Sequence, residues 1–439
     1  MNKLESMNIR KLVITMSGPI TISMLVQASY NIVDSIFVAK YSQDALLAVS
    51  LCYPIQTIMV AVSCGIGVGF NTVLAKALGS KDSDKANKTV AQGILISLFN
   101  WVVFVAFGLL FSTSFLRMFS SNLAVLSMGN VYIRICTVFS IGVFVQITYE
   151  RIVQATGNAF YNMLIQGVGA LINIILDPIF IFYFDMGVAG AAVATVAGQC
   201  CAMFLGIYIV QKNVSEIELR VKDFHLSKNI LCEIYRIGIP AMLMQSIMSF
   251  MTVFMNMILV QFSDLAISVF NVYYKLQQFV FMAVNGMTNA LVPIISYNVG
   301  ANKMNRVFES ISFTLKISMG IMLIGCLVFQ MFPYQLLSMF SADKSMYQLG
   351  VPALRIISLS FAFAGINMVL CSSFQALNRA NASLWITLFR QMILLLPLTY
   401  VLASILGLKI AWFSFFITEI FCSIISFFYF KKIKHMFCF

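Results

Sequence analysis

Charged residues are scarce in this 439-residue sequence: they make up 10% of the chain, while apolar residues make up 60%. Ordinary globular chains carry about 25% charged residues, which cover the surface that faces water. Segments of roughly 20 residues or more pass with hardly an ionised group, the length that crosses a ~30 Å hydrocarbon core. The sequence therefore predicts an all-α polytopic membrane protein, because helices satisfy their own backbone hydrogen bonds in lipid and no alternating strands suggest a barrel.

Residues and motifs of catalytic sites are also scarce. The sequence has two histidines, neither in an apolar span, and its ten cysteines form no CxxC pair, which argues against metal and disulfide frameworks. The motifs HExxH, GxxxxGK[ST] and GxSxG are absent. We therefore predict a protein that is not an enzyme, has no cofactor and draws any pumping from an ion gradient. A membrane-embedded enzyme, the contrasting class, would need a nucleophile with a base or a metal set at membrane depth.

Basic residues outnumber acidic ones by 28 to 16, which gives a formal net charge of +12. They cluster between apolar spans instead of forming one basic face, so no nucleic-acid partner is predicted. One side of the predicted membrane receives most of them. The other side receives only Lys40, Arg117, Lys344 and Lys409. By the positive-inside rule, both chain termini are expected in the cytoplasm.

Twelve apolar runs predict twelve transmembrane helices. They lie near 12–38, 46–77, 90–115, 128–156, 160–184, 187–211, 232–262, 265–299, 307–333, 347–377, 383–406 and 410–430. The most polar stretch, 212–231, falls at the midpoint of the chain. We predict that it is a cytoplasmic linker between two lobes of six helices, 1–211 and 232–439.

The two halves are related by duplication. At an offset of 221, residues 116–159 align without a gap to 337–380, with ten identities in 44 positions. Because each half has an even number of spans, both halves insert in the same orientation and are pseudo-symmetric about an axis along the membrane normal. A ligand cavity is expected between the halves, and rocking of one half against the other would give alternating access.

Polar side chains inside the spans of the first half form a second pattern. Gln27, Tyr30, Asn31 and Asp34 follow one another at helical spacing in the first span. Such a stripe is not expected to face lipid, so we predict that it lines a cavity, with Gln27, Tyr30 and Asn31 as substrate contacts.

The fifth and sixth spans add further polar groups. Asn173 and Asp177 lie four residues apart on one helix face, and Thr195 follows in the sixth span. Measured from the outer ends of their spans, Asp34, Asp177 and Thr195 lie at a similar depth, roughly 10 Å. Two carboxylates in one low-dielectric site are expected to share a proton or bind a cation, and these oxygens suit Na⁺. The alternative is a set of interhelical hydrogen bonds that only fixes packing.

The second half lacks this acidic pattern, since Met255 stands where the first half has Asp34. Its seventh and eighth spans carry neutral polar stripes instead, which either line a cavity for an organic ligand or hold helices together. The predicted cavity residues are Gln245, Ser249, Thr252, Asn256, Tyr274, Gln278 and Asn285. Arg390 and Glu419, at similar depth on neighbouring spans, are predicted to form a structural ion pair.

An ordered set of short motifs carries a resemblance to a known family. The motifs are YNIVDSIFVA, YPIQ, GIGVG, ALGSKDSDKA, QATGN, NIILDP and GVAGAAVATV. Together they resemble the multidrug and toxic compound extrusion transporters, and most of all their bacterial DNA-damage-inducible and MepA-like branch. The resemblance covers nearly the whole chain, including both six-helix lobes.

The resemblance implies export of organic cations, often drugs, in exchange for Na⁺ or H⁺. It assigns Asp34, Asn173, Asp177 and Thr195 to the first-lobe cation site, as ligands for Na⁺ where Na⁺ is the coupling ion, and Pro19 to a bend in the first helix. It further implies a multi-pass monomer in the lipid bilayer of a bacterial cell membrane, with the coupling ion as its only cofactor. The alternative is a flippase for a lipid-linked or polar metabolite, since such proteins share the superfamily fold.

Overall fold

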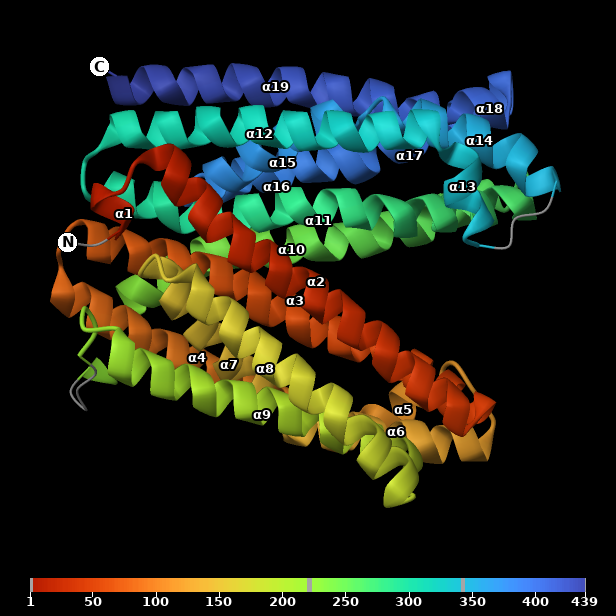
Figure 1. The fold of residues 1–439 in the computed structure, drawn as a ribbon, viewed down its shortest axis with the longest axis horizontal. Coiled ribbons are helices and arrows are strands. Elements are labelled where there is room, and N and C mark those ends of the chain that lie inside the picture. Colours follow the sequence, from red (N-terminus) through yellow and green to blue (C-terminus); the bar gives the residue numbers. More distant parts are fainter. Residues whose placement is uncertain (1–2, 219–222, 341–343, 439) are drawn as a thin grey trace. The chain divides into compact units, whose positions relative to one another are not determined.

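The computed structural model describes residues 3–218, 223–340 and 344–438, without the side chains of 437 and 438 (Figure 1). All regular structure in these ranges is helical. The helices are α1 (Lys3–Ser6), α2 (Ile9–Tyr41), α3 (Gln43–Gly79), α4 (Ser83–Leu110), α5 (Ser112–Arg117), α6 (Leu123–Val138), α7 (Ile141–Ala155), α8 (Ala159–Pro178), η1 (Ile179–Tyr183), α9 (Gly187–Asn213), α10 (Lys228–Leu259), α11 (Asp264–Gly300), α12 (Met304–Met331), α13 (Pro333–Ser338), α14 (Lys344–Ser358), α15 (Phe361–Ala376), α16 (Ala380–Leu388), η3 (Phe389–Ile393), α17 (Leu395–Leu406), α18 (Leu408–Ala411) and α19 (Phe413–Cys438). The prediction of an all-α protein is confirmed.

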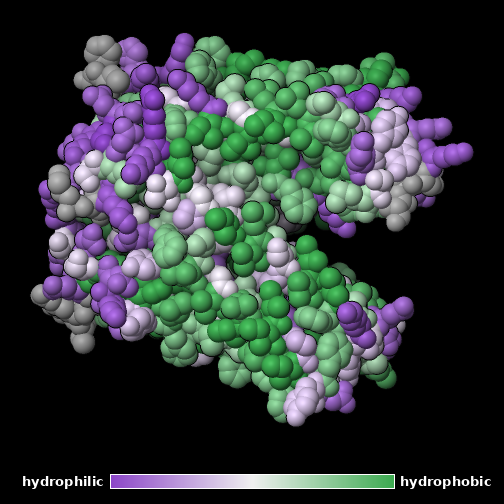
Figure 2. Space-filling view, viewed as in Figure 1, coloured by the Kyte–Doolittle hydropathy of each residue, from purple (hydrophilic) through white to green (hydrophobic). Residues whose placement is uncertain are grey.

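Ten helical segments in the described ranges are long and apolar enough to cross a membrane. Two bent pairs complete the twelve predicted spans when each pair counts as one: α6 with α7, bent by 44°, and α14 with α15, bent by 48°. Apolar side chains cover the middle of the helices in each unit, and hydrophilic side chains gather at helix ends (Figure 2). This distribution fits a protein that spans a bilayer.

The two bent pairs correspond to the spans predicted near 128–156 and 347–377. A serine lies at each break, Ser140 in the first pair and Ser360 in the second, and both are buried. The Ser140 hydroxyl donates to the carbonyl of Thr137 at 2.7 Å, and the Ser360 hydroxyl donates to the carbonyl of Ile357 at 2.6 Å. Such a bond between a hydroxyl and a carbonyl of the preceding turn accompanies both breaks, and hydropathy does not report it.

The duplication is visible helix by helix. The helices α3 and α11 each have 37 residues and begin 221 positions apart; α4 and α12 each have 28 residues at the same offset. The connections correspond too, because Lys81 and Asn302 both adopt positive φ angles, of 59° and 56°. The repeat inferred from the sequence therefore extends to the turn conformations.

The chain folds as two compact units, Met1–Ser6 with Gly18–Gly238, and Met7–Ser17 with Ile239–Phe439. Each unit has its own apolar core, around Phe144 and Tyr132 in the first and around Phe270 and Trp412 in the second. The unit boundaries fall inside two helices, beside Pro19 in α2 and beside Pro240 in α10. These prolines are 221 positions apart, so the two boundaries lie at equivalent positions of the duplicated halves. The cytoplasmic linker at 212–231 and the lobes at 1–211 and 232–439 stay predictions.

Small residues allow a close helix contact in the first unit. A Cβ on Gly69 would lie 2.2 Å from the carbonyl oxygen of Ile234, and one on Gly238 would lie 2.9 Å from the Cα of Ile66. The GIGVG motif of α3 therefore serves as a packing surface for the first part of α10.

Candidate cation-binding site

Three helices of the first unit carry the predicted cation ligands: α2 carries Asp34, α8 carries Asn173 and Asp177, and α9 carries Thr195. The helices α8 and α9 approach closely because glycines face each other. A Cβ on Gly198 would lie 2.6 Å from the carbonyl oxygen of Gly169. This close approach lets short side chains on the two helices reach each other.

Asn173 joins the two helices. Its Nδ2 donates to Oδ1 of Asp177 at 3.3 Å and to Oγ1 of Thr195 at 3.4 Å. Asp177 is fully buried and Asn173 is 3% exposed. The structure thus brings together three of the four predicted ligands through one amide group.

Asp34 completes the cluster from α2. Its carboxyl group faces the Asp177 carboxyl group. Two neighbouring carboxyl groups attract each other only when one of them carries a proton, because two ionised groups repel each other. All four predicted ligands therefore lie in one cluster.

Several oxygens of this cluster accept no hydrogen bond from the described residues. Among the described residues, no hydrogen bond reaches Oδ1 of Asp34, Oδ1 of Asn173 or Oδ2 of Asp177, although all three atoms are buried. Buried oxygens without a donor are costly, and a hard cation or a proton would satisfy them. These carboxylate, amide and hydroxyl oxygens are suitable ligands for Na⁺, and the carboxylates can equally bind H⁺.

The remaining polar residues of the first span differ in exposure. Gln27 and Tyr30 are partly buried, whereas Asn31 is exposed. Gln27, Tyr30 and Asp34 therefore form the covered stripe, and Asn31 lies outside it. Contact of Gln27, Tyr30 and Asn31 with a substrate stays a prediction.

The polar residues predicted for the second unit lie on α10 and α11. Gln245, Ser249 and Gln278 are exposed, while the other four are partly buried. These four are Thr252, Asn256, Tyr274 and Asn285. Met255, the counterpart of Asp34, is fully buried in the apolar core. The lining of a common cavity by the seven residues stays a prediction.

The predicted ion pair of the second unit is confirmed. Nη1 of Arg390 lies 3.3 Å from Oε1 of Glu419, and both side chains are about nine-tenths buried. Asn367 adds a bond from Nδ2 to Oε2 of Glu419 at 2.7 Å. Arg390 is thereby neutralised within its own unit.

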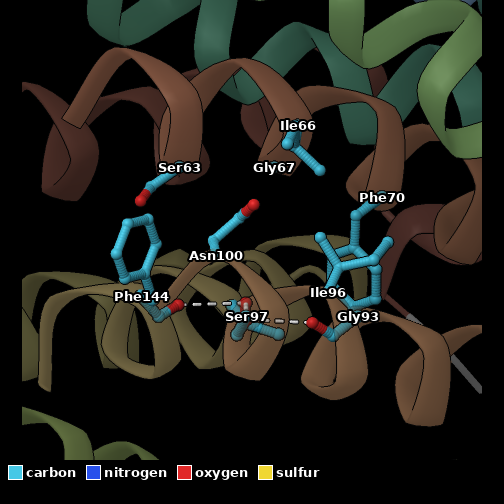
Figure 3. Close-up of a pocket in the computed structure, with 10 residues that line it drawn as sticks. Ser63, Ile66, Gly67, Phe70, Gly93, Ile96, Ser97, Asn100 and Phe144 are labelled. Carbon is cyan, nitrogen blue, oxygen red and sulfur yellow. Dashed lines mark hydrogen bonds between the residues drawn. The ribbon is translucent and has the colours of Figure 1, made fainter. Parts of the chain in front are cut away.

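A separate small cavity of about 20 Å³ lies between α3, α4 and α7 in the first unit (Figure 3). The hydroxyls of Ser97 and Thr148 share a 2.6 Å hydrogen bond at its wall, and the buried Oγ of Ser63 has no partner among the described residues. A cavity of this volume holds about one water molecule. None of the predicted site residues lines it, so it is distinct from the cation cluster.

Comparison with known families decides the identity of the fold. A model of the MatE family matches twice, over residues 19–179 and 240–401, once in each half of the repeat. The chain belongs to the MatE family. Members of this family are transporters and not enzymes, and this MatE protein is a multi-pass protein of the cell membrane.

Two curated relatives of this MatE protein are the multidrug export proteins MepA of Staphylococcus aureus strain MRSA252 and of Staphylococcus haemolyticus strain JCSC1435. The first is 25% identical over 96% of this chain and 93% of its own length. The second is 27% identical over 97% of this chain and 94% of its own length. These proteins confirm the resemblance to the MepA-like branch.

Solved structures agree in fold. An outward-facing multidrug resistance MATE transporter of the MOP superfamily superposes with a TM-score of 0.92 at 24% identity, over 99% of this chain and 98% of its own. A MOP superfamily transporter from Pyrococcus furiosus, described as having a binding pocket of reverse polarity that suggests a different function, gives the same score at 23% identity, over 100% and 98%. MATE structures in a straight and in a bent conformation match as well, with TM-scores of 0.92 and 0.93.

One buried carboxylate escaped the sequence analysis. Glu150 lies on α7 and is 3% exposed. The spacing of Gln146, Glu150 and Gln154, four residues apart in an apolar helix, was a usable signal for it.

Proposed function

We propose that this chain is a secondary active exporter of organic, cationic and amphipathic compounds, which it exchanges for Na⁺ or H⁺ by alternating access. The observation that carries the proposal is the Asp34–Asp177 pair with its buried, donor-free oxygens. The net charge of such a site changes when it binds or releases a cation. That change in charge couples an ion gradient to transport. The names of the MepA relatives support multidrug export as the activity.

The residues have distinct proposed roles. Asp34 and Asp177 bind the coupling cation, and Asn173 and Thr195 orient the carboxylates and supply further oxygens. Gln27, Tyr30 and Asn31, together with the neutral stripes of α10 and α11, contact the substrate. No other cofactor takes part, and the protein acts as a monomer with both termini in the cytoplasm.

Pro19 provides a bending point in α2. The boundary between the two units falls between Ser17 and Gly18, so the helix packs with different units before and after this point. A proline removes one backbone hydrogen bond and weakens the helix where it lies. Occupation of Asp34, further along the same helix, is proposed to change this bend.

The flippase alternative is disfavoured by the charges of the second unit. A lipid-linked phosphate would need several free basic groups at membrane depth. Of the two deep basic residues of this unit, Lys275 and Arg390, Arg390 is already paired with Glu419 at 3.3 Å. The neutral stripes of α10 and α11 suit an organic cation better than a phosphate.

A reconstituted system tests the proposed function. The purified protein is placed in liposomes preloaded with a fluorescent organic cation, and either a Na⁺ gradient or a pH gradient is imposed. Dye movement driven by one gradient supports exchange and identifies the coupling ion. Folded protein that moves no dye under either gradient contradicts it.

A further inference from the structure

A single charged side chain interrupts the long helix α11 of the second unit. Lys275 is the only ionised residue between Asp264 and Lys303 in the sequence. It lies eleven residues after Asp264, where α11 begins, and therefore about 16 Å along the helix from that end. This depth is about half of the ~30 Å hydrocarbon core. An ammonium group at such a depth needs a partner or a polar surrounding, because its charge is costly in lipid.

The second unit provides no partner for this charge. Among the described residues, none forms an ion pair or a side-chain hydrogen bond with Lys275. The described acidic residues of this unit are Asp264, Glu309 and Glu419. Of these, Glu419 is already paired with Arg390 at 3.3 Å. The charge of Arg390 is thus neutralised by the fold, whereas the charge of Lys275 is left for a ligand.

The side of α11 that carries Lys275 is polar along its length. Asn271, Lys275, Gln278 and Asn285 follow one another at intervals of four, three and seven residues, which places them on one side of a helix. Lys275 and Gln278 are exposed, and the two asparagines are partly buried. Tyr273, on the opposite side, is buried in the apolar core of the unit. Lys275 is therefore the charged member of an otherwise neutral stripe, and such a stripe is expected to face water and not lipid.

Two amide groups flank the ammonium group on this side. Asn271 lies one helical turn before Lys275, and Gln278 lies one turn after it. Side chains three or four residues apart on a helix are neighbours. Neither amide group forms a hydrogen bond with another described residue, so the N–H groups of both are available beside the ammonium group. The three side chains together offer donors to one anionic group.

The single charge of Lys275 decides which class of anion fits. A carboxylate carries one negative charge, which one ammonium group balances, and its two oxygens can accept from the ammonium group and from an amide. A phosphate monoester carries nearly two negative charges at neutral pH, which one lysine does not balance. A compound with only positive charge is repelled at this position. A carboxylate is therefore the group that the stripe suits best.

We propose that Lys275, together with Asn271 and Gln278, binds a carboxylate of the exported compound. The substrates then include zwitterions, which carry this carboxylate in addition to the cationic group. The inference rests on the proposed export and names a substrate class for it. Lys275 determines specificity in this scheme, because a zwitterion gains a partner for its carboxylate while a compound that is only cationic meets a like charge.

The test uses two rhodamine dyes of nearly the same size: a zwitterion with a free carboxylate, and its methyl ester, which is a cation. Binding of each dye to the purified full-length protein in detergent is measured by fluorescence polarisation, and gradient-driven export of each dye is measured in liposomes. The native chain is compared with Lys275→Met, which removes the charge, and with Lys275→Arg, which keeps it. Lys409→Met, at an exposed position of α18 in the same unit, is the control for loss of a lysine. Thermal unfolding in detergent confirms that each variant is folded.

We expect the native protein to bind the zwitterion more tightly than the ester. Lys275→Met should weaken binding of the zwitterion at least about tenfold, the usual effect of losing a hydrogen bond to a charged group, without weakening binding of the ester. Lys275→Arg and Lys409→Met should keep the native preference. Equal changes for both dyes, no change for either, or a native preference for the ester overturns the inference. Failure of the proposed export has a different signature, because the native protein then binds dye but no gradient moves it.

Discussion

Gly169 and Gly198 face each other across α8 and α9 so closely that a Cβ on Gly198 would lie 2.6 Å from the Gly169 carbonyl oxygen. The same added carbon would lie 3.2 Å from the Cβ of Asn173. The distance between these helices therefore sets the reach of Asn173 to Thr195. The cation cluster depends on glycines that carry no chemistry of their own.

Replacement of Gly198 by alanine is expected to push α8 and α9 apart. Because the clash is with backbone, we expect a cost of about 1–3 kcal/mol and a lower unfolding temperature in detergent, together with weaker cation coupling. Gly167→Ala on α8, the other helix of this contact, is the control, since nothing lies within 4 Å of an added Cβ there. Equal unfolding temperatures for the two variants would contradict this account of the helix contact.

Glu419→Gln tests the ion pair of the second unit. Removing the carboxylate leaves the buried Arg390 without its partner, and breaking such a pair costs about 3–5 kcal/mol. We expect a strong loss of thermal stability that the double variant Arg390→Met with Glu419→Leu largely restores, because no charge then remains buried. If the double variant is less stable than Glu419→Gln, the pair has a role beyond charge compensation.

Pro19→Ala tests bending at the unit boundary. Alanine restores a backbone hydrogen bond at this position, so the helix should resist bending. We expect normal folding and cation binding but several-fold slower dye export. Pro54→Ala is the control, because α3 lies entirely within the first unit. A rate equal to that of the native protein would show that transport does not need a bend at Pro19.

Much of the fold could be predicted because the sequence records it twice. The 221-residue offset found by comparing 116–159 with 337–380 recurs in the lengths of α3 and α11 and in the positive φ angles of Lys81 and Asn302. The breaks at Ser140 and Ser360 could not be predicted from hydropathy. At each break one serine hydroxyl donates to one carbonyl, and neither group alters the apolar character of the segment.

The candidate site was partly predictable for a similar reason. Asp34, Asn173 and Asp177 stand out because ionised or amide groups are rare in these spans, and their helical spacing places Asn173 and Asp177 on one face. Glu150 was missed although its helix carries the same kind of pattern. Its partner Gln166 comes from α8, and only the packing of α7 against α8 brings the two together.

The most direct test of the central claim is gradient-driven dye export by Asp34→Asn beside the native protein and Asp44→Asn. Asp44 lies in the first turn of α3 in the same unit, outside the proposed site, and serves as the control. We predict that Asp34→Asn inserts and folds normally but no longer moves dye against its gradient, while Asp44→Asn behaves as the native chain. Full gradient-driven export by correctly inserted Asp34→Asn would contradict the assignment of the coupling site.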